Sequence, residues 1–203
     1  MNYTGPKVKL SRRLGLALTP KAAQIMAKRP YPPGQHGRHQ QFKDRNPSDY
    51  KRQLLEKQKL RLQYNIHERQ MRNYFIKASR RMGNTVDNLM QLLETRLDAV
   101  VLRAGLARTI YAARQYVTHG HILVNGRRVN LPAYRVKVDD VVSVKEKSRR
   151  LACFAEALAS TAGTPPYLKT SKAEMSAQLL YLPPRYEVPV ICEVSLVIEY
   201  YSR

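Results

Sequence analysis

The sequence predicts an α+β fold in which helices pack on an antiparallel sheet. Apolar residues from Val86 to Val101 repeat at helical spacing, which predicts an amphipathic helix. Asn125-Gly126 lies between short runs of branched apolar residues, the strongest short-range signal for a β-hairpin with a type I′ turn. Residues 1–46 are rich in Pro, Gly and basic side chains, which predicts an extended segment that gains order on a partner.

The charge of this 203-residue chain indicates a polyanionic partner. The formal net charge is +21, and residues 1–81 hold 20 Lys and Arg against 4 Asp and Glu. Nucleic acid is the first candidate and an anionic membrane the second. The membrane is disfavoured because no run of 18 apolar residues occurs and the basic residues are not gathered on one amphipathic helix.

Two basic helices are expected after the N-terminal segment, over residues 49–64 and 66–82. Ser48 is placed to cap the first, with Tyr50, Leu54, Leu55 and Leu62 inward and its basic residues outward. A run of charge is usually only a solvated face, but these helices carry few acids, which favours phosphate contact. Within residues 29–37, prolines stiffen the backbone and glycines allow close approach, although an ordinary Pro-rich linker fits equally well.

The middle of the chain is predicted to form helices followed by short strands. Thr85 and Thr109 are the expected caps of helices over 86–101 and 110–117, and the later elements are a strand 122–124, an extended stretch 134–138 and a strand 141–144. Towards the C-terminus, 150–160 looks helical and 179–182 extended. Residues 188–201 have the composition of a strand, so their state is ambiguous.

The two cysteines, Cys153 and Cys192, lie 39 positions apart and outside any CxxC pair. We expect both to be reduced. The N-terminus lacks the apolar stretch of a secretory signal, so the expected location is the cytoplasm.

Candidate RNA contacts are basic residues of the N-terminal segment and the two basic helices, and arginines near the predicted hairpin. Polar and aromatic groups around the hairpin are added because they suit irregular RNA. They are Lys7, Lys9, Arg12, Arg13, Arg29, His36, Arg38, Lys43, Arg45, Lys51, Arg52, Lys57, Lys59, Arg61, Arg69, Arg72, Arg103, Arg108, Arg114, Gln115, His119, His121, Asn125, Arg127, Arg128 and Tyr134. For His119 and His121 the alternative is a helix end with exposed imidazoles. No metal-ligating residues and no cofactor are predicted.

Several motifs resemble an RNA-binding domain named after small ribosomal subunit protein four. They are Thr95-Arg96-Leu97-Asp98, Ala113-Arg114-Gln115-x-Val117, His119-Gly120-His121-Ile122-x-Val124-Asn125-Gly126 and Pro132-x-Tyr134-x-Val136. The flanks resemble the bacterial form of that ribosomal protein family, through Leu10-Ser11-Arg12-Arg13-Leu14-Gly15, residues 29–37, Pro47-Ser48-Asp49-Tyr50 and Glu199-Tyr200-Tyr201-Ser202-Arg203.

The resemblance implies three parts: a basic extended segment 1–46, a mainly helical domain 47–92 completed by about 190–203, and an inserted RNA-binding domain 93–189 with its core at 95–148. The last dozen residues would be helical and pack on the N-terminal helices. The family's partners would be small-subunit ribosomal RNA, ribosomal proteins three and five, and messenger RNA, with no membrane and no required homo-oligomer. Some relatives bind zinc through an N-terminal cysteine cluster, which this chain lacks.

An RNA-modifying enzyme is the alternative, because Arg96-Leu97-Asp98 resembles the motif of pseudouridine synthases, where the Asp is the nucleophile. Against it, Asp98 lies inside a strongly periodic helix and the remaining chain is too short for a separate catalytic domain. We therefore predict that Asp98 is a structural or helix-surface carboxylate and that the protein is not an enzyme.

Overall fold

The computed structural model describes residues 3–39, 47–160 and 163–203. The chain forms two compact units, one of Met1–Phe75 with Val190–Arg203 and one of Ile76–Pro189. We call them the helical unit and the sheet unit. None of the helices within the described ranges is long and apolar enough to cross a membrane.

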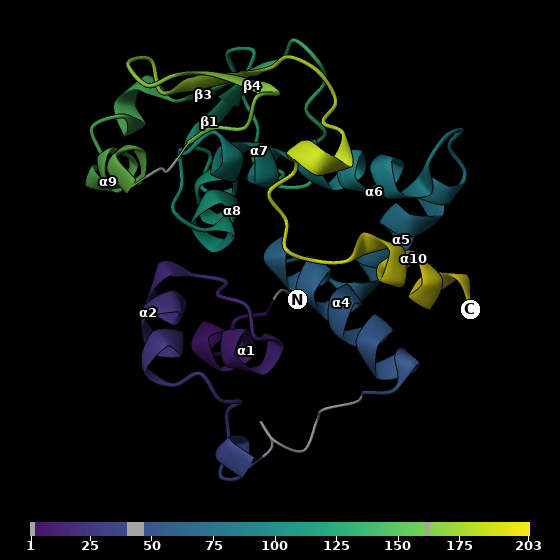
Figure 1. The fold of residues 1–203 in the computed structure, drawn as a ribbon. Coiled ribbons are helices and arrows are strands. Elements are labelled where there is room, and N and C mark those ends of the chain that lie inside the picture. The colour runs from purple at the N-terminus through teal and green to yellow at the C-terminus, as the bar shows by residue number, and fades with distance from the viewer. Residues whose placement is uncertain (1–2, 40–46, 161–162) are drawn as a thin grey trace. The chain divides into compact units, whose positions relative to one another are not determined.

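The helical unit begins with two helices where the sequence predicted an extended segment. They are α1 (Lys7–Leu14) and α2 (Pro20–Lys28), which pack on each other (Figure 1). The Thr19 hydroxyl caps α2 by accepting from the Ala22 N–H at 3.2 Å, and Ser11 Oγ of α1 accepts the Leu18 N–H at 3.2 Å. The prediction was wrong because these helices are short, so caps and side-chain bonds define them rather than long apolar periodicity.

The rest of the helical unit is α4 (Asp49–Gln63), α10 (Val194–Ser202) and the greater part of α5 (Glu68–Ser79), whose residues 76–79 belong to the sheet unit. Ser48 caps α4, as predicted. The predicted inward face of α4 was partly wrong: Leu62 is buried, but Tyr50 and Leu55 are 52% and 39% exposed, and Gln53 and Lys57 are buried instead.

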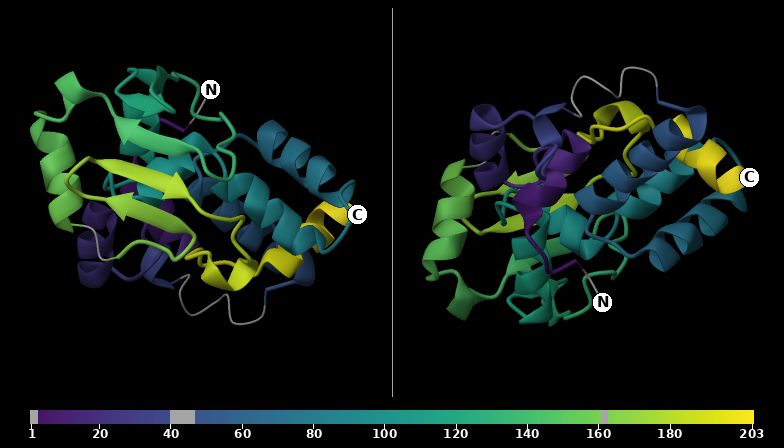
Figure 2. Two further views of the ribbon diagram at one scale, coloured as in Figure 1. Left: turned by 90° about the horizontal axis from the view of Figure 1, so that it is seen from above. Right: turned by 90° about the horizontal axis from the view of Figure 1, so that it is seen from below.

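Residues 194–202 form a helix despite their strand-like composition, and α10 packs on α4, as the resemblance implied (Figures 1 and 2). Val194 and Val197 lie one turn apart and are both buried. Tyr201 stacks on Phe75 with ring centroids 5.2 Å apart and donates to Glu68 at 2.7 Å. Tertiary packing therefore overrides β propensity in this segment.

The sheet unit contains α6 (Thr85–Glu94), α7 (Leu97–Arg103), α8 (Ile110–Thr118) and α9 (Ala152–Ser160). The single helix predicted over 86–101 is thus two helices, broken at Thr95–Arg96. The break exists because residues 132–136 supply partners there: Leu97 N–H donates to Tyr134 O at 2.9 Å, and Val136 N–H donates to Thr95 O at 2.8 Å. Residues 134–138, expected to be extended, form only an isolated bridge between Arg96 and Arg135. The cap of α6 is Asn84 rather than Thr85.

The five strands form one antiparallel sheet in the order β2-β1-β3-β5-β4. The strands are β1 (Ile122–Val124), β2 (Arg127–Arg128), β3 (Val141–Val144), β4 (Leu168–Ser171) and β5 (Ser176–Leu179). Asn125 and Gly126 connect β1 to β2 with φ of 49° and 77°, as the predicted type I′ turn requires. The antiparallel sheet and the helices together confirm the α+β class.

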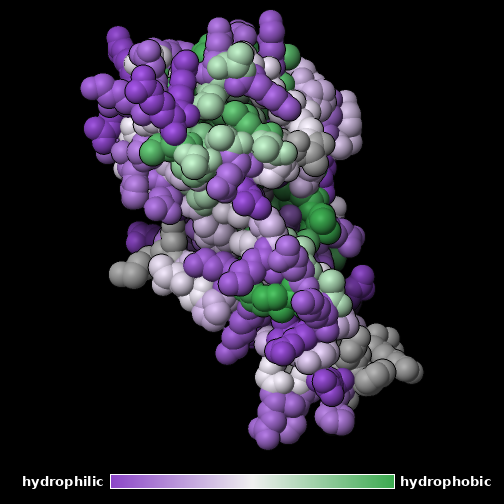
Figure 3. Space-filling model, turned by 90° about the vertical axis from the view of Figure 1, so that its left-hand side faces the viewer, coloured by the Kyte–Doolittle hydropathy of each residue, from purple (hydrophilic) through white to green (hydrophobic). Residues whose placement is uncertain are grey.

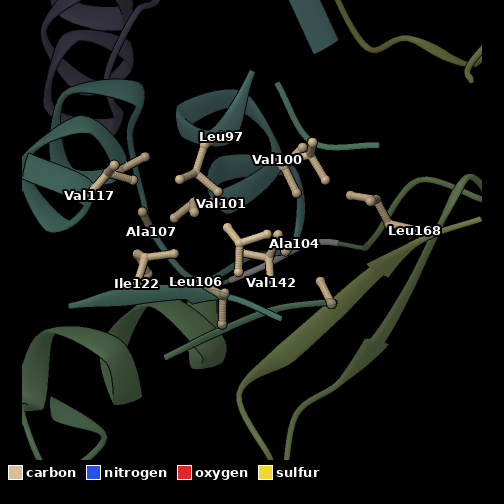
Figure 4. Packing of buried hydrophobic residues seen from close by; sticks show 14 of the residues in the cluster. Leu97, Val100, Val101, Ala104, Leu106, Ala107, Val117, Ile122, Val142 and Leu168 are labelled. Carbon is tan, nitrogen blue, oxygen red and sulfur yellow. The ribbon is translucent and has the colours of Figure 1, made fainter. Parts of the chain in front are cut away.

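One face of the sheet is covered by α7 and α8 (Figures 1 and 2). Leu97, Val100 and Val101 of α7 pack with Ile122 and Val142 of the strands, and all five are at most 1% exposed (Figure 4). Alternation along each strand places Ile122, Val124, Val142 and Val144 on this inner face. This core fixes the end of α8 beside the β1–β2 hairpin.

Candidate nucleic-acid interface

Positive groups gather where α8 ends and the hairpin begins. His119 follows α8, and its ring centroid lies 6.0 Å from that of His121. The Arg128 guanidinium lies directly against Gly120, so closely that a Cβ at this position would collide with it. Burial lowers the pKa of His121, and the charges of His119, Arg128 and Lys145 lower it further. His119, His121, Arg128 and Lys145 form what we call the histidine cluster, a region of positive potential.

The hairpin exposes Arg127 and Arg128, while Asn125 is used by the fold. The Asn125 amide donates to Asp140 at 2.8 Å, and its carbonyl oxygen accepts the Val141 N–H at 2.8 Å. Asn125 thus holds the turn to β3, so its side-chain groups already have partners. Sequence reasoning missed Lys145; its position just after a strand beside the histidines was the available signal.

A buried ion-pair network lies at the start of α7. Asp98 and Arg96 have fully buried side chains, with Arg96 donating to Asp98 at 2.9 and 2.6 Å. Arg114 of α8 lies 3.6 Å from the same carboxylate and is 24% exposed. Burial raises the pKa of Asp98, against the opposing influence of Arg96 and Arg114. Asp98 is therefore structural, as predicted, but not at the surface.

This geometry gives no support to a nucleophilic role for Asp98. Its oxygens accept from Arg96 and the Ala99 N–H, and no part of its side chain is exposed. A nucleophile has to reach its substrate, and this carboxylate does not.

Other predicted contacts in the sheet unit differ in accessibility. Arg103 binds the buried Glu94 carboxylate at 2.9 Å, and Tyr167 donates to the same group at 3.0 Å, so we assign Arg103 to the fold. Arg108 lies 3.6 Å from Glu156 with both side chains about half exposed or more. The exposed members are Arg108, Gln115, His119, Arg127, Arg128 and Tyr134.

In the helical unit most of the predicted cations are accessible. Lys9, Arg13, Arg29, His36, Arg38, Lys51, Arg52, Arg69 and Arg72 are exposed, and Lys7, Arg12, Lys59 and Arg61 are half-buried. Lys43 and Arg45 lie outside the described residues. On the face drawn in Figure 3, hydrophilic residues surround smaller apolar patches.

Lys57 corrects the prediction that the basic residues of α4 project outward. It is 4% exposed, binds Glu68 at 3.0 Å and lies 4.4 Å from the centre of the Tyr200 ring. A buried ammonium needs such partners, and it has no surface to offer to RNA. The Tyr200 and Tyr201 rings of α10 lie against Lys57, which the sequence of α4 alone did not reveal.

Arg12 and Arg38 organise the Pro-rich residues 29–37. Arg12 donates to the Tyr31 and Pro32 carbonyls at 3.0 and 3.3 Å, and both guanidiniums lie over the Tyr31 ring, at 4.9 and 5.2 Å. The hydrogen bond from Arg38 and the nearby positive charges lower the pKa of Tyr31. The segment is thus a folded turn rather than an ordinary linker.

Two consecutive segments of the chain match known protein families. Residues 2–94 match the ribosomal protein S4/S9 N-terminal domain, and residues 95–142 match the S4 domain. A protein of Streptomyces avermitilis named small ribosomal subunit protein uS4 is 50% identical over 206 residues, covering 100% of this chain and 99% of its own length.

Proteins of the same name from two further bacteria agree. The Micrococcus luteus protein is 52% identical over 97% of this chain and 95% of its own length, and the Geobacillus kaustophilus protein is 49% identical over 99% and 98%. These relatives are named as ribosomal proteins, not as enzymes. The chain belongs to the uS4 family of ribosomal proteins.

Proposed function

We propose that this protein is a structural constituent of the small ribosomal subunit and binds small-subunit ribosomal RNA in the cytoplasm. The observation that carries the proposal is identity of about 50% along the full chain to proteins named small ribosomal subunit protein uS4. The net charge of +21 supports it, because phosphate neutralisation supplies much of the affinity of such proteins for RNA.

The finer proposal concerns the place of binding. We infer primary binding to the 5′ domain of the ribosomal RNA, which nucleates assembly, near the channel through which messenger RNA enters. Neighbours there would be ribosomal proteins three and five, with Arg38, Lys43 and Arg45 touching messenger RNA. In this scheme residues 1–46 supply most of the electrostatic attraction to the RNA, and residues 47–92 with 190–203 form the helical scaffold. Residues 93–189 recognise the shape of the RNA.

The accessible cations support this division of labour. The histidine cluster and Arg127 present positive groups at the end of α8 and on the neighbouring hairpin, and Tyr134, 37% exposed, adds a ring on which a base can stack. Lys57, Arg103 and Asn125 are left out of the RNA contacts, because the structure gives them internal partners.

The test is binding of the full chain to a transcript of the 5′ domain at increasing salt. If about ten phosphates are neutralised, log affinity falls with log salt at a slope of roughly −7 to −9. Recovery of the native protein in stoichiometric amount with small subunits is the second expected result. A slope near −2, or a protein that sediments free of ribosomes, would overturn the proposal.

The enzymatic alternative makes a different forecast. A pseudouridine synthase would change uridines in RNA and lose that activity when Asp98 is replaced by Asn. We expect no uridine conversion by the purified protein.

A further inference from the structure

An apolar groove with a basic rim lies between α1 and α4 within the helical unit. Its volume is about 470 Å³. The floor is aliphatic, formed by Leu10 and Leu14 of α1 and Leu54, Leu55 and Leu62 of α4, and the charged side chains along it are Arg13, Lys51 and Arg61. No carboxylate lines it.

The groove continues into a second hollow of about 370 Å³, which shares Arg13, Lys51 and Leu55 and adds Arg52. Two carboxylates, Glu56 and Glu193, lie at this far end. The Glu56 carboxylate already has partners within the protein, because it binds Lys59 at 2.6 Å and accepts the Glu193 N–H at 2.9 Å. The net charge along the combined groove is therefore positive.

The accessibility of the lining fits a ligand rather than an internal contact. Leu55 is 39% exposed although it lies on the apolar floor. Arg13 is exposed and makes no hydrogen bond or ion pair with any residue that the structure describes. By contrast, the Arg61 guanidinium already donates two hydrogen bonds to the Gln58 side-chain oxygen, at 2.9 and 2.7 Å.

We propose that this groove binds one unstacked nucleotide of the RNA, with its base on the leucine floor and its flanking phosphates on Arg13 and Lys51. The inference rests on the proposed function and deepens it. The four cations along the groove, Arg13, Lys51, Arg52 and Arg61, were each selected from the sequence as phosphate contacts, and the fold brings them to an apolar hollow in which a base could leave water.

Charge complementarity decides the occupant. A base offers an apolar face of any sequence, and its backbone carries one negative charge per nucleotide, which matches an aliphatic floor with a basic rim. A basic helix would place like charges against Arg13 and Lys51 at a cost, and a neutral helix would leave the basic rim without a charged partner from the ligand. An acidic amphipathic peptide is the competing occupant, and the test separates the two.

The test compares Leu55→Ser with Leu182→Ser, because Leu182 is 40% exposed, much like Leu55, but lines neither hollow of the groove. Both variants keep the charge of the chain. For the 5′-domain transcript we expect Leu55→Ser to lower affinity about five- to tenfold with an unchanged salt slope, and Leu182→Ser to bind like the unaltered protein. Arg13→Gln should lower the affinity and also reduce the slope by about 0.7 to 0.9.

Chemical probing of the RNA supplies the decisive pattern. Base protection lost in the Leu55→Ser complex should be confined to one or two adjacent nucleotides. Thermal unfolding of each variant shows that the loss is not caused by misfolding.

Three results would overturn the inference. The first is equal RNA affinity for Leu55→Ser and Leu182→Ser, and the second is loss of protection spread over the transcript. The third is unchanged RNA affinity together with a Glu- and Leu-rich peptide that binds the unaltered protein but not Leu55→Ser, which would assign the groove to a protein segment. If the unaltered protein itself fails to bind the transcript, the proposed function fails instead.

Discussion

At the scale of single residues, charged side chains in this protein divide into those that hold the fold and those that face outward. Lys57, Arg96 and Arg103 are cations like Arg13 and Arg127, yet each has little exposed surface and binds a carboxylate of the same chain. Residue type therefore predicted the chemistry of the surface, but not which members reach it. The difference matters most at Asp98, where removal would leave a buried guanidinium.

We predict that Asp98→Ala destabilises the sheet unit by about 3–5 kcal/mol, because the fully buried Arg96 loses the carboxylate that balances its charge. Arg108→Ala is the control: it breaks an exposed pair with Glu156 and should change stability by no more than about 1 kcal/mol. Urea unfolding measures both. Equal, small effects of the two substitutions would contradict the role assigned to Asp98.

Glu68 should make the helical unit less stable in acid. Burial raises the pKa of Glu68, but hydrogen bonds from Tyr201 and Lys57 and the charges of Lys57 and Arg61 outweigh it, so the pKa is lowered overall. A folded pKa below the unfolded one means that this stabilisation is present above the unfolded value, near 4.5, and is lost as pH falls through the folded value.

The measurement is urea unfolding between pH 7 and pH 3 for Glu68→Gln and for Glu146→Gln, an exposed control. We expect the unaltered protein and Glu146→Gln to lose stability in parallel, and Glu68→Gln to lose less over the acid range. Parallel curves for all three proteins would show that Glu68 contributes nothing to the acid response.

At the scale of elements, the sequence predicted correctly those helix starts and turns whose stabilising hydrogen bonds or dihedral angles involve only residues close in the chain. The predicted caps at Ser48 and Thr109 each accept a backbone N–H three residues away, and Asn125-Gly126 sets the hairpin by its own dihedral angles. Elements whose ends depend on distant residues were misjudged. The break between α6 and α7 needs the carbonyl oxygens of Pro132 and Tyr134, which no pattern within 86–101 reveals.

The cap of α8 allows a matched pair of substitutions on one helix. Thr109 Oγ1 accepts the Ala112 N–H at 3.2 Å, so Thr109→Ala should destabilise the protein by about 0.5–2 kcal/mol. Thr118 lies at the other end, is exposed and donates only to carbonyls already within the helix; Thr118→Ala should be within about 0.5 kcal/mol of neutral. Chemical denaturation compares them, and a larger effect at Thr118 would count against the cap.

At the scale of the whole molecule, segments from the two halves of the sequence make up the helical unit, and the sheet unit is formed by the residues between them. α10 lies on α4 through Gln53 and Glu199, 2.9 Å apart, and through the tyrosines around Lys57. The helical unit is thus incomplete without the last residues of the chain. The sheet unit has its own core and needs no residue from α10.

Deletion of residues 194–203 should therefore destabilise one unit and spare the other. We expect hydrogen exchange to rise in α4, where Gln53 and Lys57 lose their contacts with α10, and in α5, where Phe75 loses Tyr201, while β1, β3 and α7 keep their protection. The full chain is the reference. Equal loss of protection in both units would show that they fold as one cooperative body.

The sequence by itself determined the α+β class, the helix starts at Ser48 and Thr109, the hairpin and the excess of positive charge, because these depend on neighbours within a few residues or on composition. Its motifs also indicated the uS4 family, to which the chain belongs. Only the tertiary structure decided that residues 194–202 are helical, that Lys57 and Asp98 are buried, and that Arg13, Lys51 and Leu55 line one groove. The physical reason is that burial and charge pairing are set by residues far apart in the chain, such as Lys57 with Tyr200 or Asp98 with Arg114. A local sequence pattern does not indicate which distant side chain will cover a residue and exclude water from it.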